Sequence, residues 1–309
     1  MRWILIACAL ATGSAAALEN REVEIERDDG AVLHATLLHP QGARDLVLIQ
    51  AGSGPTDRDG NQPSMTNNSL RMLAEGLAGE GIAVLRHDKR GSGESSSDLE
   101  ETDLRPQVFI DDLGAWLSWA REEEQFEAFH LLGHSEGALF AKALAAEHKV
   151  DSVISVAGAG RPAGVLLREQ VAGRLPDEMA DAFEHSLSEL EAGRQVDEVP
   201  GILESLFRVS VQPYLIAWLA MEPARMADAL DVPLAVIVGS SDLQVAREDF
   251  DALSEHAEKS RWIEGMNHVL KPAEGSLAEQ MAVYSDPDLA LHEALVPTIA
   301  GFIADRTAD

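Results

Sequence analysis

The sequence predicts an α/β fold, in which one mostly parallel sheet of eight strands carries helices on both faces. Apolar runs of strand length alternate with helical stretches along most of the chain, and this alternation is typical of parallel strands joined by helical crossovers. Between about residues 161 and 230 the alternation stops, and every segment there has helical periodicity. This break predicts a helical cap inserted into a single sheet domain.

The first two strands differ from the others because they have the pattern of a hairpin. Residues 21–27 and 31–39 alternate in polarity around the turn Asp28-Asp29-Gly30, which predicts an antiparallel edge. Further strands are expected as short apolar runs at 45–50, 82–86, 129–133, 150–157, 234–238 and 261–263. Helices are expected between them at about 70–79, 106–124, 136–148, 247–258 and 288–305. The cap helices, separated by proline and glycine, are expected at 163–175, 177–191, 202–209 and 213–230.

The first seventeen residues have the pattern of a signal peptide. Arg2 supplies the positive start, residues 3–11 an apolar run, and residues 15–17 (AAA) a small-residue cleavage site. The run is well short of the ~20 residues that cross a bilayer, so we expect cleavage after Ala17 and export to a periplasm or out of the cell. Cys8 is the only cysteine, so the mature domain of residues 18–309 would contain no disulfide bond.

The charge balance argues against two classes of partner. The chain has 53 acidic and 24 basic residues and a formal net charge of −29, and such a field repels nucleic acid and anionic lipid. No stretch after the first seventeen residues is long and apolar enough for a membrane span. Only five of the basic residues are lysine. The composition is consistent with a highly soluble acidic surface and also with adaptation to a salty environment, and it does not decide between them.

The strongest local signal is the motif G-x-S-x-G at residues 133–137 (GHSEG). It lies between an expected strand and an expected helix, the context in which this motif forms a sharp turn that exposes its serine. Side chains at Gly133 and Gly137 would collide with the neighbouring backbone, which explains the two glycines. A chance Gly-Ser turn is a poorer interpretation in that context. Ser135 is therefore the candidate nucleophile of an α/β-hydrolase fold.

A serine hydroxyl needs a base to remove its proton, and in this fold the acid and the base follow the serine in that order. Asp242 comes just after the strand at 234–238, and His268 follows the next strand. The carboxyl ends of parallel strands meet at one edge of the sheet. We therefore expect His268 to take the Ser135 proton and Asp242 to orient the imidazole.

Other histidines compete for the role of base. His256 and His292 fall within expected helices, whereas His87 and His134 lie in other loops. A single histidine is more often a surface or hydrogen-bonded residue than a catalytic one. The order along the chain and the position after a strand favour His268.

Chemistry at a carbonyl also needs donors for the developing oxyanion. The backbone N–H of Glu136, directly after the nucleophile, is one expected donor. The second should come from the loop after the third strand, residues 51–55 (AGSGP), where small residues allow a close approach. We assign it to the Ser53 N–H, although an ordinary turn that closes the strand is the alternative.

Two further loops resemble ligand sites without matching them. Residues 57–61 (DRDGN) are similar to a calcium loop, but they lack its third ligand and its distant glutamate. A loop braced by charge pairs is the better interpretation. Residues 87–93 (HDKRGSG) are glycine-rich and basic but match no phosphate-binding pattern. We expect them to form a turn at the rim of the active-site edge, and we expect no metal or organic cofactor.

The cap contains an aromatic stripe. Tyr214 and Trp218 share one helix face, with Leu215 beside them, and apolar residues flank the stripe on both sides. Such a stripe is commonly plain core. Because a cap inserted after the sixth strand lies over the end of the sheet that carries Ser135, Tyr214 and Trp218 are also candidates for the substrate pocket. Both interpretations stay open.

Five segments together resemble a known family. They are residues 51–61, 87–95, the GHSEG motif, 210–218 (SVQPYLIAW) and 265–271 (GMNHVLK). In this order they resemble the EstD-type carboxylesterases of the α/β-hydrolase superfamily, close to the serine aminopeptidase-like hydrolases. The resemblance implies the same triad and the hydrolysis of small-molecule esters with short to medium acyl chains, without a cofactor. Residues 161–200 match least, which leaves the substrate preference open.

Two other functions stay open beside ester hydrolysis. The same triad could cleave peptides or amides, as serine aminopeptidase-like enzymes do. A catalytically inactive binding protein could retain the fold, although the complete triad and oxyanion loop argue against it. The sequence does not indicate an oligomeric state.

Overall fold

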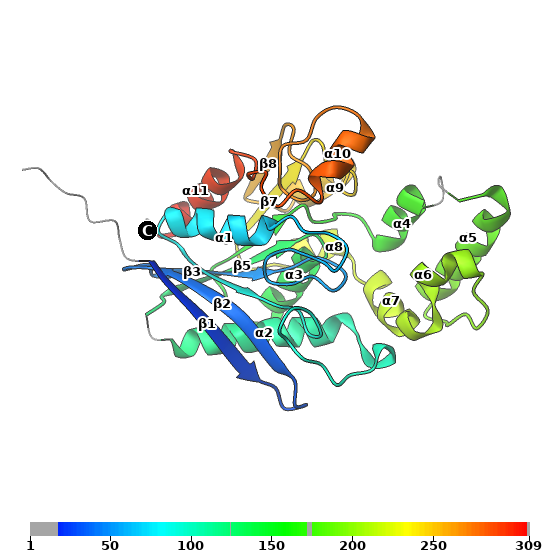
Figure 1. Ribbon diagram of the computed structural model, residues 1–309, viewed down its shortest axis with the longest axis horizontal. Helices are drawn as coiled ribbons and strands as arrows, with labels where there is room; N and C mark the ends of the chain where they lie inside the picture. Colours follow the sequence, from blue (N-terminus) through cyan, green and yellow to red (C-terminus); the bar gives the residue numbers. More distant parts are fainter. Residues whose placement is uncertain (1–17, 124, 172–174, 308–309) are drawn as a thin grey trace, which may run out of the picture.

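One sheet of eight strands forms the centre of the protein, for which a computed structural model describes residues 18–123, 125–171 and 175–307. The strands are β1 (Leu18–Glu26), β2 (Val32–Pro40), β3 (Asp45–Gln50), β4 (Ala83–His87), β5 (Ala128–His134), β6 (Ser152–Val156), β7 (Leu234–Gly239) and β8 (Lys259–Ile263). They lie in the order β1-β2-β4-β3-β5-β6-β7-β8, so that β1 and β8 form opposite edges of the sheet (Figure 1). β2 pairs antiparallel with β1 and with β4, and the other neighbours are parallel. The predicted mostly parallel sheet with an antiparallel hairpin at its edge is confirmed.

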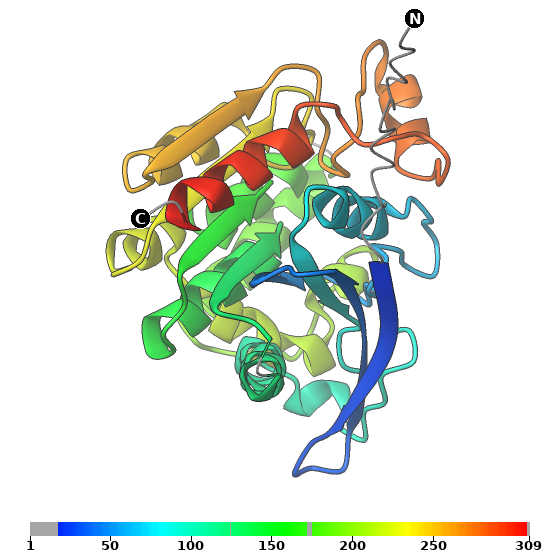
Figure 2. The ribbon, with the colours of Figure 1, turned by 90° about the vertical axis from the view of Figure 1, so that its left-hand side faces the viewer.

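Helices cover both faces of this sheet (Figure 2). One face carries α1 (Ser69–Gly79) and α11 (Leu295–Thr307), and the other carries α2 (Pro106–Glu122), α3 (Gly137–Glu147), α8 (Pro223–Asp228) and α9 (Arg247–Ser254). Successive strand residues point to opposite faces, so Leu46 packs in the cluster with α2 and α3, whereas Val47 packs in the cluster with α1 and α11. Burial on both faces explains why these strands are continuous apolar runs in the sequence.

The described residues between β6 and α8 contain helices and no strand. The α-helices are α4 (Ala163–Val171), α5 (Asp177–Glu191), α6 (Glu204–Phe207) and α7 (Gln212–Leu219). They form a group at one side of the sheet domain (Figure 1). Phe183, Leu187 and Phe207 are buried in an apolar cluster made of residues between Ala163 and Leu219 alone. This segment, called the cap below, therefore has a small core of its own.

Two predicted cap helices are wrong in extent. The single helix expected over 213–230 is divided into α7 and α8, because Pro223 begins α8 and has no N–H with which to continue α7. The helix expected over 202–209 is shortened to α6, with 3₁₀ turns at Gly201–Leu203 and Val209–Val211 on either side.

Two differences lie near the carboxyl terminus. The closing helix begins at Leu295, later than expected, because the Asp286 side chain accepts hydrogen bonds from the N–H groups of Asp288 and Leu289 and so favours a turn. A further helix, α10 (Leu277–Val283), was not predicted. Its apolar residues Leu277 and Met281 are exposed, so α10 lacks the buried stripe by which an amphipathic helix is recognised.

The predicted signal peptide, residues 1–17, lies outside the described residues. None of the helices in the described part of the chain combines the length and the apolar character that a bilayer crossing demands.

Candidate active site

Ser135 lies in a sharp turn between β5 and α3. Its backbone φ is +55°, a left-handed conformation that costs energy for a residue with a side chain. A Cβ at Gly133 would come within 2.3 Å of the Gly137 carbonyl oxygen, and a Cβ at Gly137 within 2.3 Å of the Gln50 carbonyl oxygen. Only glycine fits on either side, and the turn presents the serine hydroxyl beyond the end of the strand.

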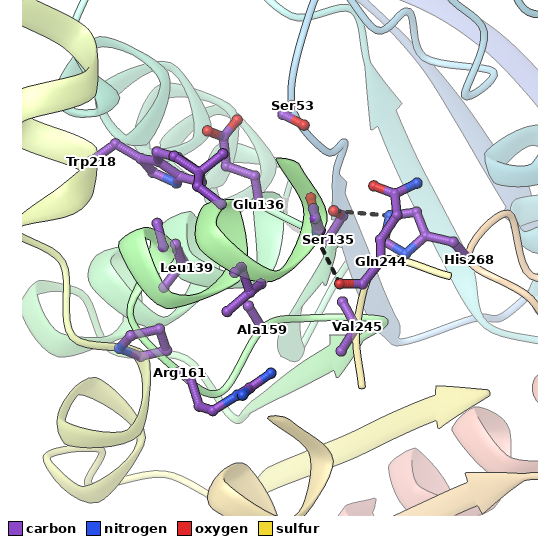
Figure 3. Close-up of a pocket in the computed structure, with 15 residues that line it drawn as sticks. Ser53, Ser135, Glu136, Leu139, Ala159, Arg161, Trp218, Gln244, Val245 and His268 are labelled. Carbon is purple, nitrogen blue, oxygen red and sulfur yellow. Dashed lines mark hydrogen bonds between the residues drawn. The ribbon is translucent and has the colours of Figure 1, made fainter. Parts of the chain in front are cut away.

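The structure brings the three predicted triad residues together. The His268 Nε2 atom lies 3.1 Å from the Ser135 Oγ (Figure 3), and the His268 Nδ1 lies 2.9 Å from the Asp242 Oδ2. Asp242 Oδ1 also accepts the backbone N–H groups of Gln244 and Val245, at 2.8 and 2.9 Å. These bonds fix the carboxylate, and the carboxylate fixes the imidazole so that Nε2 faces the hydroxyl.

The other histidines weighed as bases lie elsewhere. His134 Nε2 donates to the His268 carbonyl oxygen at 2.8 Å. Burial, followed by repulsion from His268, lowers the pKa of His134 to about 4, so His134 stays neutral. Its hydrogen bond to the His268 carbonyl oxygen holds the loop that carries the base. His87 is buried at the end of β4, and burial lowers its pKa. The helical positions predicted for His256 and His292 are wrong, because α9 ends before His256 and α11 begins after His292.

Both expected oxyanion donors belong to residues that line the same hollow as Ser135 (Figure 3). Glu136 follows the nucleophile directly, and Ser53 lies in the loop after β3. A Cβ at Gly52 would lie 3.0 Å from the Ser135 Cβ, so this loop passes directly beside the nucleophile. The turn that carries Ser135, called the elbow below, and the loop after β3 therefore converge where an oxyanion would form.

Three hollows meet around these residues. The first has a volume of about 100 Å³, contains Ser135 and His268, and has the apolar side chains of Leu139, Leu167 and Trp218 in its wall. The second, of about 230 Å³, also contains Ser135 and His268 and is more polar than the first. Its polar side chains include Ser53, Thr56, Gln62, Asn67, Ser69, Gln244 and Tyr284. The third, of about 550 Å³, lies between the cap and the loop after β4 and includes Ser53 and Glu136.

The two predicted pocket residues line different hollows. Trp218 is in the wall of the 100 Å³ hollow beside Ser135, whereas Tyr214 is in the wall of the 550 Å³ hollow. The Tyr214 hydroxyl donates to Glu136 Oε1 at 2.7 Å. Leu215 lines neither hollow and is buried in the core of the cap. Both aromatic residues also pack partly against the main core, so the stripe lies between the hollows and the core, and its role in substrate binding stays a prediction.

The loop at 57–61 is braced by internal bonds and charge pairs. The Asp57 Oδ1 accepts the N–H groups of Asp59 and Asn61. Arg58 forms an ion pair with Asp88 at 2.7 Å and further pairs with Glu22 and Glu94. Among the residues that the structure describes, no group of three or more acidic, histidine or cysteine side chains could hold a metal ion.

Lys89 is a buried residue beside the site that the sequence did not indicate. The loop at 87–93 was expected at the rim of the site, and residues 89–92 do line the 550 Å³ hollow. Within it, Lys89 is only 4% exposed and lies 3.6 Å from Glu136.

Comparison with known proteins agrees with this geometry. Residues 66–271 match the sequence pattern of the family described as serine aminopeptidase, S33. Esterase EstD of Thermotoga maritima is 28% identical over 241 residues, which are 75% of this chain and 54% of that esterase. The chain therefore spans about half the length of that relative.

Solved structures with lower identity share the fold. Est1E from Butyrivibrio proteoclasticus, with ferulic acid bound, is 18% identical, covers 93% of this chain and all of its own, and has a TM-score of 0.65. The Pyrococcus furiosus esterase Pf2001 is 16% identical over 94% of this chain and 92% of its own, with a TM-score of 0.60. The predicted α/β-hydrolase fold and the resemblance to EstD-type esterases are confirmed, and the chain belongs to the serine aminopeptidase S33 family.

Proposed function

We propose that the protein hydrolyses carboxylic esters through an acyl-serine intermediate. The observation that carries this proposal is the chain of hydrogen bonds from Asp242 through His268 to Ser135 at the edge of an apolar hollow. His268 Nε2 accepts the hydroxyl proton while Ser135 Oγ attacks the ester carbonyl carbon. The protonated imidazole then donates this proton to the departing alkoxide, and the acyl group stays on Ser135. Water, deprotonated by His268, releases the carboxylic acid and restores the serine.

The hollows support an assignment of the two halves of the substrate. The 100 Å³ hollow is apolar and adjoins Ser135, so it suits the acyl chain. A cavity of about 150 Å³ holds a benzene molecule, and the smaller volume here therefore favours short acyl chains within the short-to-medium range. The 230 Å³ hollow is the more polar of the two and contains His268, which must protonate the leaving group, so it suits the alcohol.

Amide and peptide cleavage by the same triad is the second candidate, because it gives the family its name. An aminopeptidase must bind the free ammonium group of its substrate, for which a free carboxylate is suited. The carboxylates that line the three hollows are those of Glu101 and Glu136. Glu101 is paired with Arg208, and Glu136 with Lys89. Since both carboxylates are already paired, ester hydrolysis is favoured.

Two measurements test this proposal. The first compares p-nitrophenyl esters with aminoacyl anilides as substrates of the purified protein, and we expect turnover of the esters to be much faster. The second is covalent labelling by a fluorophosphonate, with the modified residue identified by mass spectrometry. Labelling at Ser135 together with ester turnover supports the proposal. A protein that turns over neither substrate and is not labelled would instead be a binding protein of this fold.

Export is part of the proposed function. It rests on residues 1–17, whose positive start, apolar run and small-residue site are typical of a signal peptide. Expression of the full chain in a bacterium, followed by fractionation and amino-terminal sequencing, tests it. A mature protein that begins at Leu18 outside the cytoplasm is the expected result.

A further inference from the structure

Lys89 places a buried positive charge beside the oxyanion loop. Its Nζ donates to the Gly52 carbonyl oxygen at 2.9 Å and lies 3.6 Å from Glu136 Oε2. The same atom lies 4.6 Å from the centre of the Phe109 ring, a distance at which a cation is attracted to an aromatic face. The side chains of Lys89 and Glu136 are 4% and 5% exposed. The ammonium group is thus enclosed among a carbonyl, a carboxylate and a ring.

The contact with Gly52 acts on an oxyanion donor. The Gly52 carbonyl and the Ser53 N–H belong to one peptide group, and all described peptide bonds are trans. In a trans peptide the C=O and the N–H point in opposite directions, so a donor that fixes the oxygen also fixes the direction of the N–H. A positive charge at the oxygen also polarises the group and makes the N–H a stronger donor.

The contact with Glu136 reaches the other donor. The Glu136 backbone N–H is the donor at the elbow, and its carboxylate lies between Lys89 and the Tyr214 hydroxyl. Burial and the neighbouring Glu136 charge both raise the pKa of Tyr214, so the hydroxyl remains a donor. Because Tyr214 belongs to α7, one chain of contacts joins the oxyanion loop, the elbow and the cap.

Stability alone does not account for this arrangement. Removal of two charges from water costs several kcal/mol for each ion, and a packed apolar replacement is often as stable. Burial lowers the pKa of Lys89 although the Glu136 carboxylate raises it, which shows that the desolvation is not fully offset. The ion pair also occurs where catalysis requires fixed dipoles.

We propose that Lys89 is a positioning residue of the oxyanion hole, which holds the Gly52–Ser53 peptide and, through Glu136 and Tyr214, joins both oxyanion donors to the cap. This inference rests on the proposed ester hydrolysis. Loss of a complete oxyanion donor lowers kcat by about 10²–10³-fold. If the donor remains but is no longer held in position, the fall in kcat should be smaller, about 10- to 100-fold.

The test compares wild type with Lys89→Met, which keeps the stem over Phe109 and removes the donor and the charge. We expect kcat on a p-nitrophenyl ester to fall by about 10- to 100-fold while KM changes by less than about threefold. Inhibition by a trifluoromethyl ketone, which forms an oxyanion on Ser135, should weaken by the same factor as kcat/KM. Lys142→Met serves as the control, because Lys142 is equally buried but lines none of the three hollows.

Glu136→Gln and the double variant with Lys89→Met provide an independent measurement. Glu136→Gln keeps the backbone N–H, and we expect a fall in kcat. Since the Lys89 and Glu136 side chains act through one shared contact, the double variant should be hardly worse than Lys89→Met alone. If Lys89→Met does not fold, Lys89→Gln takes its place in the same comparison.

Two results would overturn the inference. One is a folded Lys89→Met protein with wild-type kcat, and the other is a loss confined to KM, which would make Lys89 a substrate-binding residue. Both require an active wild type labelled at Ser135 by the fluorophosphonate. A wild type without turnover or labelling would instead refute the proposed function, so the two failures are distinguishable.

Discussion

Replacement of Lys142 by methionine should stabilise the protein and change the pH dependence of its unfolding. Lys142 lies on α3, is 1% exposed, and its Nζ has no hydrogen-bond partner in the described structure. Burial alone lowers its pKa from 10.5 to about 7. One pKa unit corresponds to about 1.4 kcal/mol, so folding carries a penalty of about 5 kcal/mol at pH values below the folded-state pKa. Methionine has a similar shape and no charge, and the free energy of unfolding should rise by about that amount.

The sign of the pH effect follows from the two pKa values. The unfolded chain holds the proton up to pH 10.5, whereas the folded chain loses it near pH 7. The penalty in the wild type is therefore full below pH 7, shrinks as the pH rises, and disappears above 10.5. Urea unfolding of both proteins from about pH 6 to about pH 9 measures this difference. Titration of other groups is common to both proteins and cancels.

The control is Lys149→Met, since Lys149 is exposed near the end of the same helix and its replacement should change the stability by less than about 0.5 kcal/mol. A gain for Lys142→Met that is constant over the pH range would show that its amine is not the cause. A loss of stability would show that the amine is paired or reaches water.

The remaining predictions concern the catalytic residues and the pocket. Ser135→Ala should leave a folded protein, by circular dichroism, with kcat lowered by roughly 10⁴-fold or more, and retention of a few per cent of activity would refute the assignment. Asp242→Asn and His268→Ala should each remove most esterase activity, and the double variant should be hardly less active than the less active single variant. His256→Ala should leave the activity unchanged in the same assay. Trp218→Ala should shift the ratio of kcat/KM for butyrate and octanoate esters toward octanoate by about 1–3 kcal/mol, because it enlarges the acyl hollow, while phosphonate labelling persists. An unchanged ratio would assign Trp218 to the core alone.

The sheet and the triad could be predicted because their signals are local. The strand at 45–50 was predicted with its observed bounds, since burial on both faces produces a continuous apolar run. Ser135, Asp242 and His268 each follow a strand, and strand order then determines where they meet. Lys89 could not be predicted in the same way. Its partner Gly52 is 37 residues away in the chain, and no periodicity records such a contact. α10 was missed for a related reason, since an exposed helix leaves no buried stripe in the sequence.

The cap has an apolar cluster that contains no residue of the sheet. The cap follows β6 and leads through α8 to β7. β6 and β7 are neighbours in the sheet, with Val153 opposite Leu234. An insertion with its own core and adjacent ends can be exchanged for another without rearrangement of the host. We therefore expect chimaeras that exchange this segment between relatives to fold and to transfer acyl preference, provided that they retain a hydroxyl in place of Tyr214 for Glu136. Under the proposed function, the part of the acyl pocket that the cap supplies and the catalytic triad belong to separate stretches of chain, which can diverge at different rates in evolution.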